Sequence, residues 1–326
     1  MTIDTFTHAL RAGVEEFLCN FAGQKILFYP NPGNAGDCLI LSGTMAAFER
    51  ANIEAVVIGQ GADVSGRTVF IGGGGNFIDL YADVRQMIEA CHAGAERFVL
   101  LPHTIRGNEK LIASLDQRAT LWCRDTPSLQ HTRSLNPALD CRSGHDMAFH
   151  CDAFQFLNDP VILRKAYPKL DADLARHGTS LLELSKLDCV RLMRRDREAL
   201  DLNCQSDLDV STAFGEASDG ATARVISWCL LKTVSSARRI VTDRLHVAIA
   251  AALLKRPCEL LDNAYNKNRS VYEHSLSGFP NLSFNRVLAL PLPDQPPPRQ
   301  RSFLGILRRN ARIFVRKHFS GEEVAQ

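Results

Sequence analysis

Short apolar runs alternate with helix-length segments along most of the chain. Runs of this composition and spacing are typical of buried parallel strands joined by crossover helices. The predicted strands are Lys25–Tyr29, Ala55–Ile58, Thr68–Ile71, Arg97–Leu101 and Thr120–Cys123, then Cys189–Leu192, Arg239–Thr242, Cys258–Leu261 and Arg286–Leu290. The pattern therefore favours an α/β protein over an all-α or all-β protein.

The two series of strands predict two domains, for which 326 residues are sufficient. We expect a first domain at 1–155, which carries glycine-rich loops, and a second at 187–290, with a connecting segment at 156–186. A proline-rich linker at 291–300 and a basic amphipathic tail at 301–326 are expected to follow.

Composition narrows the class of protein further. Hydrophobic residues make up 45% and charged residues 23%, as in globular proteins with packed cores, and the net charge of +2 gives no reason to expect a nucleic-acid partner. The first 24 residues resemble neither a signal peptide nor a membrane span, and no later stretch reaches about 18 apolar residues. The 10 cysteines form no CxxC pair. We expect reduced core thiols in a cytoplasmic protein and no metal site.

The tail raises a separate possibility of membrane contact. Its basic residues are Arg301, Arg308, Arg309, Arg312, Arg316 and Lys317, and its apolar helical face is Leu304, Leu307, Ala311 and Phe314. A helix of this kind binds anionic lipid surfaces, which predicts peripheral association with the inner face of the membrane. Docking of the helix on the protein itself, or a solvated tail, is the equally weighted alternative. Co-sedimentation of the full chain and residues 1–296 with liposomes distinguishes them.

Two glycine-containing segments follow predicted strands. The first, Gly33–Asp37, opens a helix. Its backbone N–H groups can bind an anion, or the segment can be a simple turn with Asp37 as N-cap. The second is the run Gly72–Gly75 followed by Asn76, and it is expected to be a loop that admits a substrate against bare backbone. The run matches neither a dinucleotide fingerprint nor a Walker A loop.

A third segment, Asp243-Arg244-Leu245-His246, lies where a predicted strand becomes a helix. Thr242 or Asp243 can cap this helix, which places Arg244 and His246 in its first turn. Cations there oppose the helix dipole, and an anionic ligand would resolve the conflict. The alternative is a structural ion pair from Arg244 to Asp243 or another acid.

Other polar residues also follow predicted strands. His103 and Arg124 come just after strands, Asp146 precedes an apolar run, and Asp262 to Lys267 follow the strand at Cys258–Leu261. Because ligand groups gather at the carboxyl ends of parallel strands, we expect these side chains to lie together.

Taken in order, these segments resemble the polysaccharide pyruvyl transferases. The resemblance covers about Lys25 to Lys267, with a glycine run and the Asp-Arg-Leu-His segment as its most specific parts. The matching strings are Pro32–Asp37, Gly72–Phe77, Asp146–Phe149, Arg194–Glu198, Thr242–His246 and Leu261–Asn263. Many relatives carry glycine where this chain has Val247, and glutamine where it has His103.

The resemblance implies a fold and a reaction. The expected fold is two doubly wound Rossmann-like domains that face a cleft, as in GT-B glycosyltransferases. The expected donor is phosphoenolpyruvate, and the acceptor is a sugar or a lipid-linked oligosaccharide. The product is a pyruvate ketal in an exopolysaccharide or cell-surface glycan. No cofactor is required, and a divalent metal ion is allowed but not needed.

Roles for individual residues follow from the resemblance and from the charge of the donor. Arg244 and Arg124 are expected to bind its anionic groups, with Lys267 as a third cation. His246 is expected to be the general acid, and His103 a second catalytic residue that deprotonates the sugar or holds the phosphate. The expected substrate-binding residues are Arg124, Asn34, Gly36, Asp37, Gly73, Gly74, Asn76, Asp146, Asp243, Asn263 and Lys267.

Two alternatives share much of this pattern. A GT-B glycosyltransferase that uses a nucleotide sugar would have the same fold and a similar anion site. A non-catalytic component of a polysaccharide assembly complex is the other alternative, and the Arg244–His246 pair argues against it.

Overall fold

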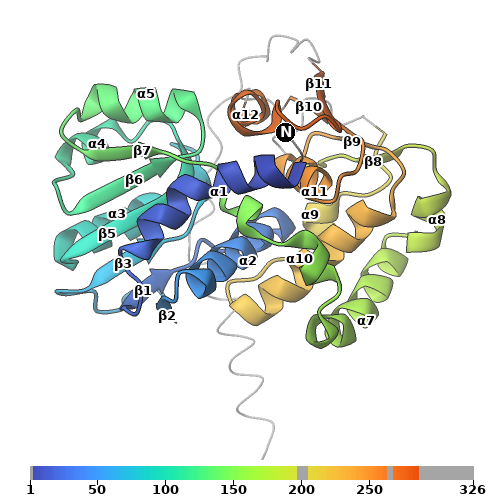
Figure 1. Ribbon diagram of the computed structural model, residues 1–326, viewed down its shortest axis with the longest axis horizontal. Helices are drawn as coiled ribbons and strands as arrows, with labels where there is room; N and C mark the ends of the chain where they lie inside the picture. The colour runs from blue at the N-terminus through green and yellow to red at the C-terminus, as the bar shows by residue number, and fades with distance from the viewer. Residues whose placement is uncertain (1–2, 197–204, 263–266, 286–326) are drawn as a thin grey trace, which may run out of the picture. The chain divides into compact units, whose positions relative to one another are not determined.

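Two parallel β-sheets organise the described residues of the computed structural model, which are 3–196, 205–262 and 267–285 (Figure 1). Both sheets lie within one compact unit, Met1–Val287. The expected linker and basic tail at 291–326, and the expected strand Arg286–Leu290, lie outside the described residues.

The larger sheet has seven strands in the order β2-β1-β3-β5-β6-β7, with β4 paired to β5. The strands are β1 (Lys25–Tyr29), β2 (Glu54–Val57), β3 (Thr68–Ile71), β4 (Gly74–Phe77), β5 (Arg97–Ile105), β6 (Ala119–Cys123) and β7 (Asp140–Ser143). All of its strand pairs are parallel. Their carboxyl ends therefore meet at one edge of the sheet.

Helices cover both faces of this sheet. They are α1 (Ile3–Cys19), α2 (Ala35–Arg50), α3 (Asp83–Gly94), α4 (Glu109–Ser114) and α5 (Thr126–Leu135). Alternate strand residues face opposite ways, so Phe28 and Phe70 pack with α1 and α2, whereas Val69 and Phe98 pack with α3 and α4. A parallel sheet covered on both faces is the Rossmann-like arrangement that the apolar runs predicted.

The second sheet has four parallel strands in the order β11-β10-β9-β8. These are β8 (Val190–Leu192), β9 (Ile240–Thr242), β10 (Cys258–Leu261) and β11 (Leu282–Asn285). Its helices are α6 (Ala153–Leu157), α7 (Pro160–Arg176), α8 (Leu181–Lys186), α9 (Val210–Ala213), α10 (Gly220–Ser236), α11 (Leu245–Leu253) and α12 (Lys267–Val271). This half also contains a 3₁₀ helix, η1 (Met147–His150), and a π-helix, η2 (Tyr272–Leu276). Helices α2 and α10 pack against each other and join the cores of the two halves.

Most predicted strands are confirmed, and the exceptions have physical causes. Gly74–Phe77, expected to be a loop, is the short strand β4. Strand β5 continues to Ile105, so His103 lies inside a strand instead of after it, and a register shift next to Pro102 accommodates the missing N–H group. Strand β7 was not predicted because it is a short edge strand of sequence Asp-Cys-Arg-Ser. The expected connecting segment is largely helical.

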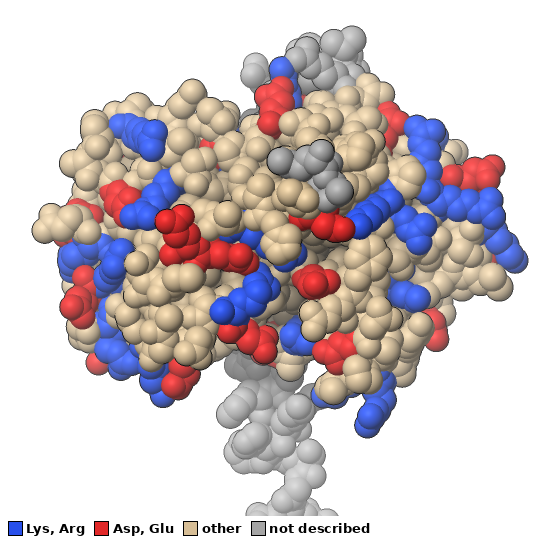
Figure 2. Space-filling view, in the orientation of Figure 1, with Lys and Arg blue, Asp and Glu red and all other residues tan. Residues whose placement is uncertain are grey.

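Most of the described cysteines are buried thiols, as the sequence predicted. Acidic and basic side chains are interspersed over the face drawn in Figure 2. Among the described helices none is long and apolar enough to cross a membrane. Within the described ranges, no three His, Cys, Asp or Glu side chains group as metal ligands would.

Candidate active site

Arg124 is the centre of a buried polar cluster at the carboxyl edge of the larger sheet. It directly follows β6 and is fully buried. Its Nη1 atom donates a hydrogen bond to Asp146 Oδ2 at 2.5 Å, and its Nε atom donates to Thr104 Oγ1 at 2.9 Å. The Nη2 atom is buried and has no hydrogen-bond partner among the described residues. Since a buried donor without a partner is costly, Nη2 is a candidate to bind an anionic ligand.

Asp146 links Arg124 to His246. Its Oδ1 atom accepts from the backbone N–H of Ala148 at 2.9 Å and caps η1. Its Oδ2 atom lies 3.5 Å from His246 Nε2, an ion-pair distance when the ring is protonated, and Nε2 makes no hydrogen bond within the part of the chain that the structure describes. Burial by itself would raise the pKa of the Asp146 carboxyl, but Arg124 and His246 together hold that pKa well below its usual range. Asp146 therefore stays ionised and orients two candidate site residues.

His246 is the second residue of α11 and faces the start of α2. The sequence expectation that Arg244 also lies in the helical turn was wrong, because Arg244 is the N-cap and α11 begins at Leu245. The His246 ring lies so close to Gly36 that a Cβ atom there would collide with Nδ1. Glycine is therefore required at position 36 so that the His246 ring can pack against it.

The turn before α2 is a capping box. Asn34 Oδ1 accepts from Gly36 N at 2.8 Å, and Asp37 Oδ2 accepts from Asn34 N at 3.0 Å. Asn34 is thus the N-cap in place of Asp37, the cap considered from the sequence. Burial raises the pKa of the Asp37 carboxyl, against the opposing charges of His246, Lys267 and Arg124. Asp37 therefore belongs to the same electrostatic cluster.

Lys267 and Arg124 meet at Gly75. Lys267, at the start of α12, donates from Nζ to the backbone oxygen of Gly75 at 3.1 Å. A Cβ atom at Gly75 would collide with both Lys267 Nζ and Arg124 Nη2. Only a glycine lets these two cationic groups flank the same position, where they can bind one anionic group together.

Gly73 and Gly74 of the same run are closely packed, and Gly74 begins strand β4 where a loop was expected. A Cβ atom at Gly73 would lie 2.8 Å from the backbone oxygen of Pro102, and one at Gly74 would collide with the side chain of Asn31. Glycine is therefore needed to bring β4 against its neighbours. Gly73 and Gly74, which were expected to bind substrate, thus have a structural role in the packing of β4.

His103 is held by two asparagines. Its Nε2 atom lies 3.0 Å from Asn76 Oδ1, which also accepts from Asn31 Nδ2 at 2.8 Å. The side chain is fully buried. Burial, followed by the charges of Arg124 and Lys267, lowers the pKa of the His103 imidazole well below its usual value. A neutral His103 can accept a proton, but it cannot hold phosphate by charge.

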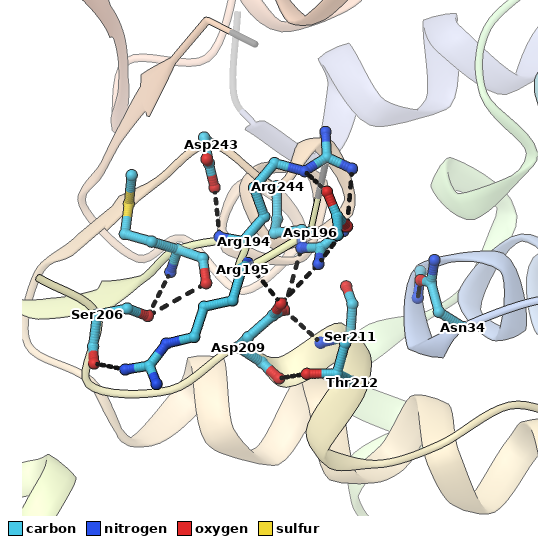
Figure 3. Close-up of polar contacts among 12 residues, drawn as sticks. Asn34, Arg194, Arg195, Asp196, Ser206, Asp209, Ser211, Thr212, Asp243 and Arg244 are labelled. Atoms are coloured by element: carbon cyan, nitrogen blue, oxygen red, sulfur yellow. Dashed lines mark hydrogen bonds and ion pairs between the residues drawn. The ribbon is translucent and has the colours of Figure 1, made fainter. Parts of the chain in front are cut away.

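Arg244 lies in a different network from Arg124 and Lys267 (Figure 3). Its Nε and Nη2 atoms donate to the two carboxylate oxygens of Asp209 at 3.1 and 2.7 Å, and Nη2 lies 2.9 Å from Asp196 Oδ2. The Arg244 side chain is 8% exposed. The expected role as an anion clamp is therefore unsupported here, and an ion pair to acids distant in sequence takes its place.

Asp243 supports the same network from the end of β9. Its Oδ1 atom accepts from Arg194 N at 2.8 Å (Figure 3), and its backbone oxygen accepts from Asn268 Nδ2 at 2.7 Å. Burial raises the pKa of the Asp243 carboxyl to about 6. Asp243 is thus a buried structural acid in the described residues. Asn263, also expected to bind substrate, lies outside them.

Replacing Asp243 with asparagine is expected to stabilise the protein relative to wild type, by an amount that grows as pH rises from about 4 to about 6 and is then constant. The raised pKa means that the folded protein keeps a proton which the unfolded chain releases. Its contribution to stability is present below about pH 4 and is lost as pH rises through about 6. Asparagine keeps the acceptor for Arg194 N, so the gain at pH 8 should be about 2–3 kcal/mol.

Urea unfolding of wild type and Asp243→Asn at pH 4 and pH 8 checks this prediction. Asp188→Asn is the matched control, because the Asp188 side chain is 99% exposed and should change stability little at either pH. A difference between wild type and Asp243→Asn that is the same at both pH values would contradict the prediction.

Some residues of the cluster were not predicted. Asn31 follows β1 just as Arg124 follows β6, so the rule for strand ends could have identified it. Thr104 lies inside β5 and Asp209 is 35 residues from its partner Arg244, so no local pattern marks either of them. Several predicted site residues do lie together in one cluster, which contains Arg124, Asp146, His246, Asp37, Lys267 and His103.

Comparison with known proteins identifies the family. The model of the polysaccharide pyruvyl transferase family matches residues 34–212, which is more than half of the chain. The chain therefore belongs to that family, as the sequence motifs predicted. Family membership supports a pyruvyl-transfer role in polysaccharide biosynthesis. No curated protein matches the chain.

The fold is shared with a solved structure. A crystal structure of a functionally uncharacterised protein from Klebsiella pneumoniae has a TM-score of 0.68 and 25% sequence identity to this chain. The match covers 85% of this chain and 98% of that chain. It supports the α/β fold with parallel sheets.

Proposed function

We propose that the protein transfers the enolpyruvyl group of phosphoenolpyruvate to a sugar and forms a pyruvate ketal during exopolysaccharide or cell-surface glycan synthesis. The observation that carries this proposal is the pair Arg124 Nη2 and Lys267 Nζ on either side of Gly75. Phosphoenolpyruvate has a phosphate and a carboxylate, and paired cations at a close backbone approach suit such a ligand.

The proposed reaction needs a proton donor and two sugar hydroxyls. A proton is added to C3 of phosphoenolpyruvate, and one hydroxyl oxygen bonds to C2 as it loses its own proton. The second hydroxyl oxygen then bonds to C2, and the C2–O bond to phosphate breaks. The phosphate leaves with the electron pair, and the two hydroxyl protons balance the proton given to C3 and the one taken up by phosphate. The net products are a ketal and inorganic phosphate.

Cluster residues have chemically suitable positions for these steps. His246 is the proposed proton donor, since it faces the cluster and its Nε2 atom lies 3.5 Å from Asp146 Oδ2. His103 is proposed to accept a hydrogen bond from a sugar hydroxyl through its neutral ring, because burial and the nearby cations oppose its protonation. Asp37 is proposed to accept a hydrogen bond from the sugar. In this scheme the two sheets correspond to the two halves of a GT-B-like arrangement.

Changing Gly75 to alanine is expected to weaken phosphoenolpyruvate binding while the protein stays folded. The added methyl group meets the ends of the Lys267 and Arg124 side chains. The Lys267 end can move aside at little cost to folding, whereas Asp146 and Thr104 hold Arg124 in place, so the two cations separate. Loss of one charge-assisted contact predicts weaker binding by roughly 10-fold or more. Isothermal titration calorimetry with phosphoenolpyruvate measures the change.

Gly59→Ala is the matched control, because a Cβ atom at Gly59 meets nothing within 4 Å. It should bind phosphoenolpyruvate as wild type does. Equal affinity of Gly75→Ala and wild type would place the anion site elsewhere. Stabilisation of the wild type by a nucleotide diphosphate but not by phosphoenolpyruvate would favour the glycosyltransferase alternative.

A further inference from the structure

A second ionic network lies at the ends of β8 and β9, and its position relative to His246 gives it a role in the proposed reaction. The network contains Arg244, Asp209, Asp196 and Arg194 (Figure 3). Arg244 is the N-cap of α11, and His246 is the second residue of that helix. Any movement of the Arg244 backbone therefore moves the candidate proton donor.

The Arg244 guanidinium is already paired with two carboxylates through its Nε and Nη2 atoms. It makes a two-point contact with Asp209 and a third contact with Asp196, at 2.7 to 3.1 Å. Asp209 is even more buried than Arg244, with a side chain that is 3% exposed. Asp196 also pairs with Arg194 Nε at 2.9 Å, so two arginines and two carboxylates balance one another within the network. An anion that bound Arg244 would have to compete with these carboxylates.

The network also fixes the backbone on which α11 begins. Thr242 Oγ1 accepts from Arg244 N at 3.0 Å and donates to the Leu192 backbone oxygen at 2.6 Å, which ties β9 to the end of β8. Asp209 accepts from Arg195 N at 2.9 Å and from Ser211 N at 3.2 Å, and so caps α9. The start of α11 is therefore held by charge and by backbone contacts together.

A connection to the turn before α2 completes the arrangement. Helix α9 packs on α2. Beyond α9, Ala217 N donates to the Gly33 backbone oxygen at 3.1 Å, and Gly33 N donates to the Ala217 oxygen at 3.4 Å. The Gly33 turn leads into Gly36, which lies against the His246 ring. Asp209 thus anchors both the helix that carries His246 and a segment joined to the turn which that ring contacts.

We propose that Arg244 is a positioning residue that fixes the orientation of the His246 ring through its Asp209 pair and does not bind the donor. The inference rests on the proposed function for its catalytic consequence. Arg124 and Lys267 hold the anion, and Arg244 determines how well the proton donor is aligned with it. A displacement of about 1 Å can lower turnover by about 100-fold, so alignment alone accounts for a large effect.

Arg244→Lys, Asp209→Asn and the double variant test the role, with Arg124→Lys as the contrasting anion ligand. Calorimetry gives the affinity for phosphoenolpyruvate, and phosphate release gives kcat. Arg244→Lys and Asp209→Asn should each lower kcat by roughly 10-fold or more, with donor affinity within about threefold of wild type. The double variant should be no worse than the poorer single variant, because both changes break one contact. Arg124→Lys should instead lose donor affinity.

An NMR measurement separates this inference from the proposed function. Imidazole ¹H–¹⁵N spectra, with the His246 signals assigned by comparison with His246→Ala, report the ring directly. Arg244→Lys and Asp209→Asn should both shift the His246 signals in a protein whose urea midpoint shows that it is folded. If Arg244→Lys does not fold, Asp209→Asn serves as the test. Unchanged His246 signals, or donor affinity lost in Arg244→Lys as in Arg124→Lys, would overturn the inference. Absence of phosphate release from the wild type, with shifted His246 signals in the variants, would overturn only the proposed function.

Discussion

Arg124→Met is expected to destabilise the protein by about 3–5 kcal/mol and to abolish phosphoenolpyruvate binding. Arg124 and Asp146 have side chains that are each 1% exposed, and they lie 2.5 Å apart. Methionine fills much of the volume but leaves the Asp146 charge buried without its strongest partner. The same change removes the Nη2 group that flanks Gly75, so stability and binding should fall together.

The stability loss should depend on pH. In the wild type the pKa of the Asp146 carboxyl is held low, so its pairing stabilises the protein above the unfolded pKa and is lost as pH falls through the folded pKa. In Arg124→Met the buried acid favours its protonated form instead. Urea unfolding should therefore show a larger deficit at pH 7.5 than at pH 4.5.

Two further variants make the interpretation specific. Arg239→Met removes an ion pair to Glu259 in which the arginine side chain is 58% exposed, and it should cost less than about 1 kcal/mol. Adding Asp146→Asn to Arg124→Met removes the unpaired charge, so part of the stability should return while donor binding stays absent. A loss in Arg124→Met no larger than that in Arg239→Met would contradict the account of the buried pair.

His246→Ala is expected to lower kcat by about 10²–10⁴-fold, with donor affinity changed only a few-fold. His246 is the proposed proton donor, while Arg124 and Lys267 supply most of the binding. The neighbouring His103 is a poor substitute, because burial and nearby cations favour its neutral form. Steady-state phosphate release and calorimetry with phosphoenolpyruvate separate the two quantities.

His177→Ala is the control for His246→Ala. His177 caps the end of α7 through its Nδ1 contact with the Asp173 backbone oxygen, and it takes no part in the cluster. This variant should retain wild-type turnover. Near-normal turnover in His246→Ala would remove the proton-donor assignment and leave the anion site at Gly75 intact.

Most of the fold could be predicted from the sequence because buried parallel strands are continuously apolar. Lys25–Tyr29, Thr68–Ile71 and Cys258–Leu261 form strands with the predicted bounds. The apolar pattern failed to identify strands that contain few apolar residues. Strand β7 is polar at the sheet edge, and β4 consists largely of glycine and asparagine.

The candidate site could be predicted only in part, because sequence places a charge without showing its partner. Arg124 and Arg244 both follow strands and both satisfied the rule for ligand groups. Arg244 is matched by Asp209, which is 35 residues earlier in the chain, whereas Arg124 Nη2 has no partner within the described ranges. Long-range pairing decides which arginine can hold an anion, and local patterns carry no record of it.

The central claim is that the chain forms a pyruvate ketal on a sugar. Its most direct test is to incubate the full-length protein with phosphoenolpyruvate and a panel of synthetic and lipid-linked glycosides, and to measure released phosphate and product mass. The account predicts an acceptor whose mass rises by one pyruvate ketal, with one phosphate released for each product molecule. Transfer of a sugar from a nucleotide donor in parallel reactions, with no ketal from phosphoenolpyruvate on any acceptor, would contradict it.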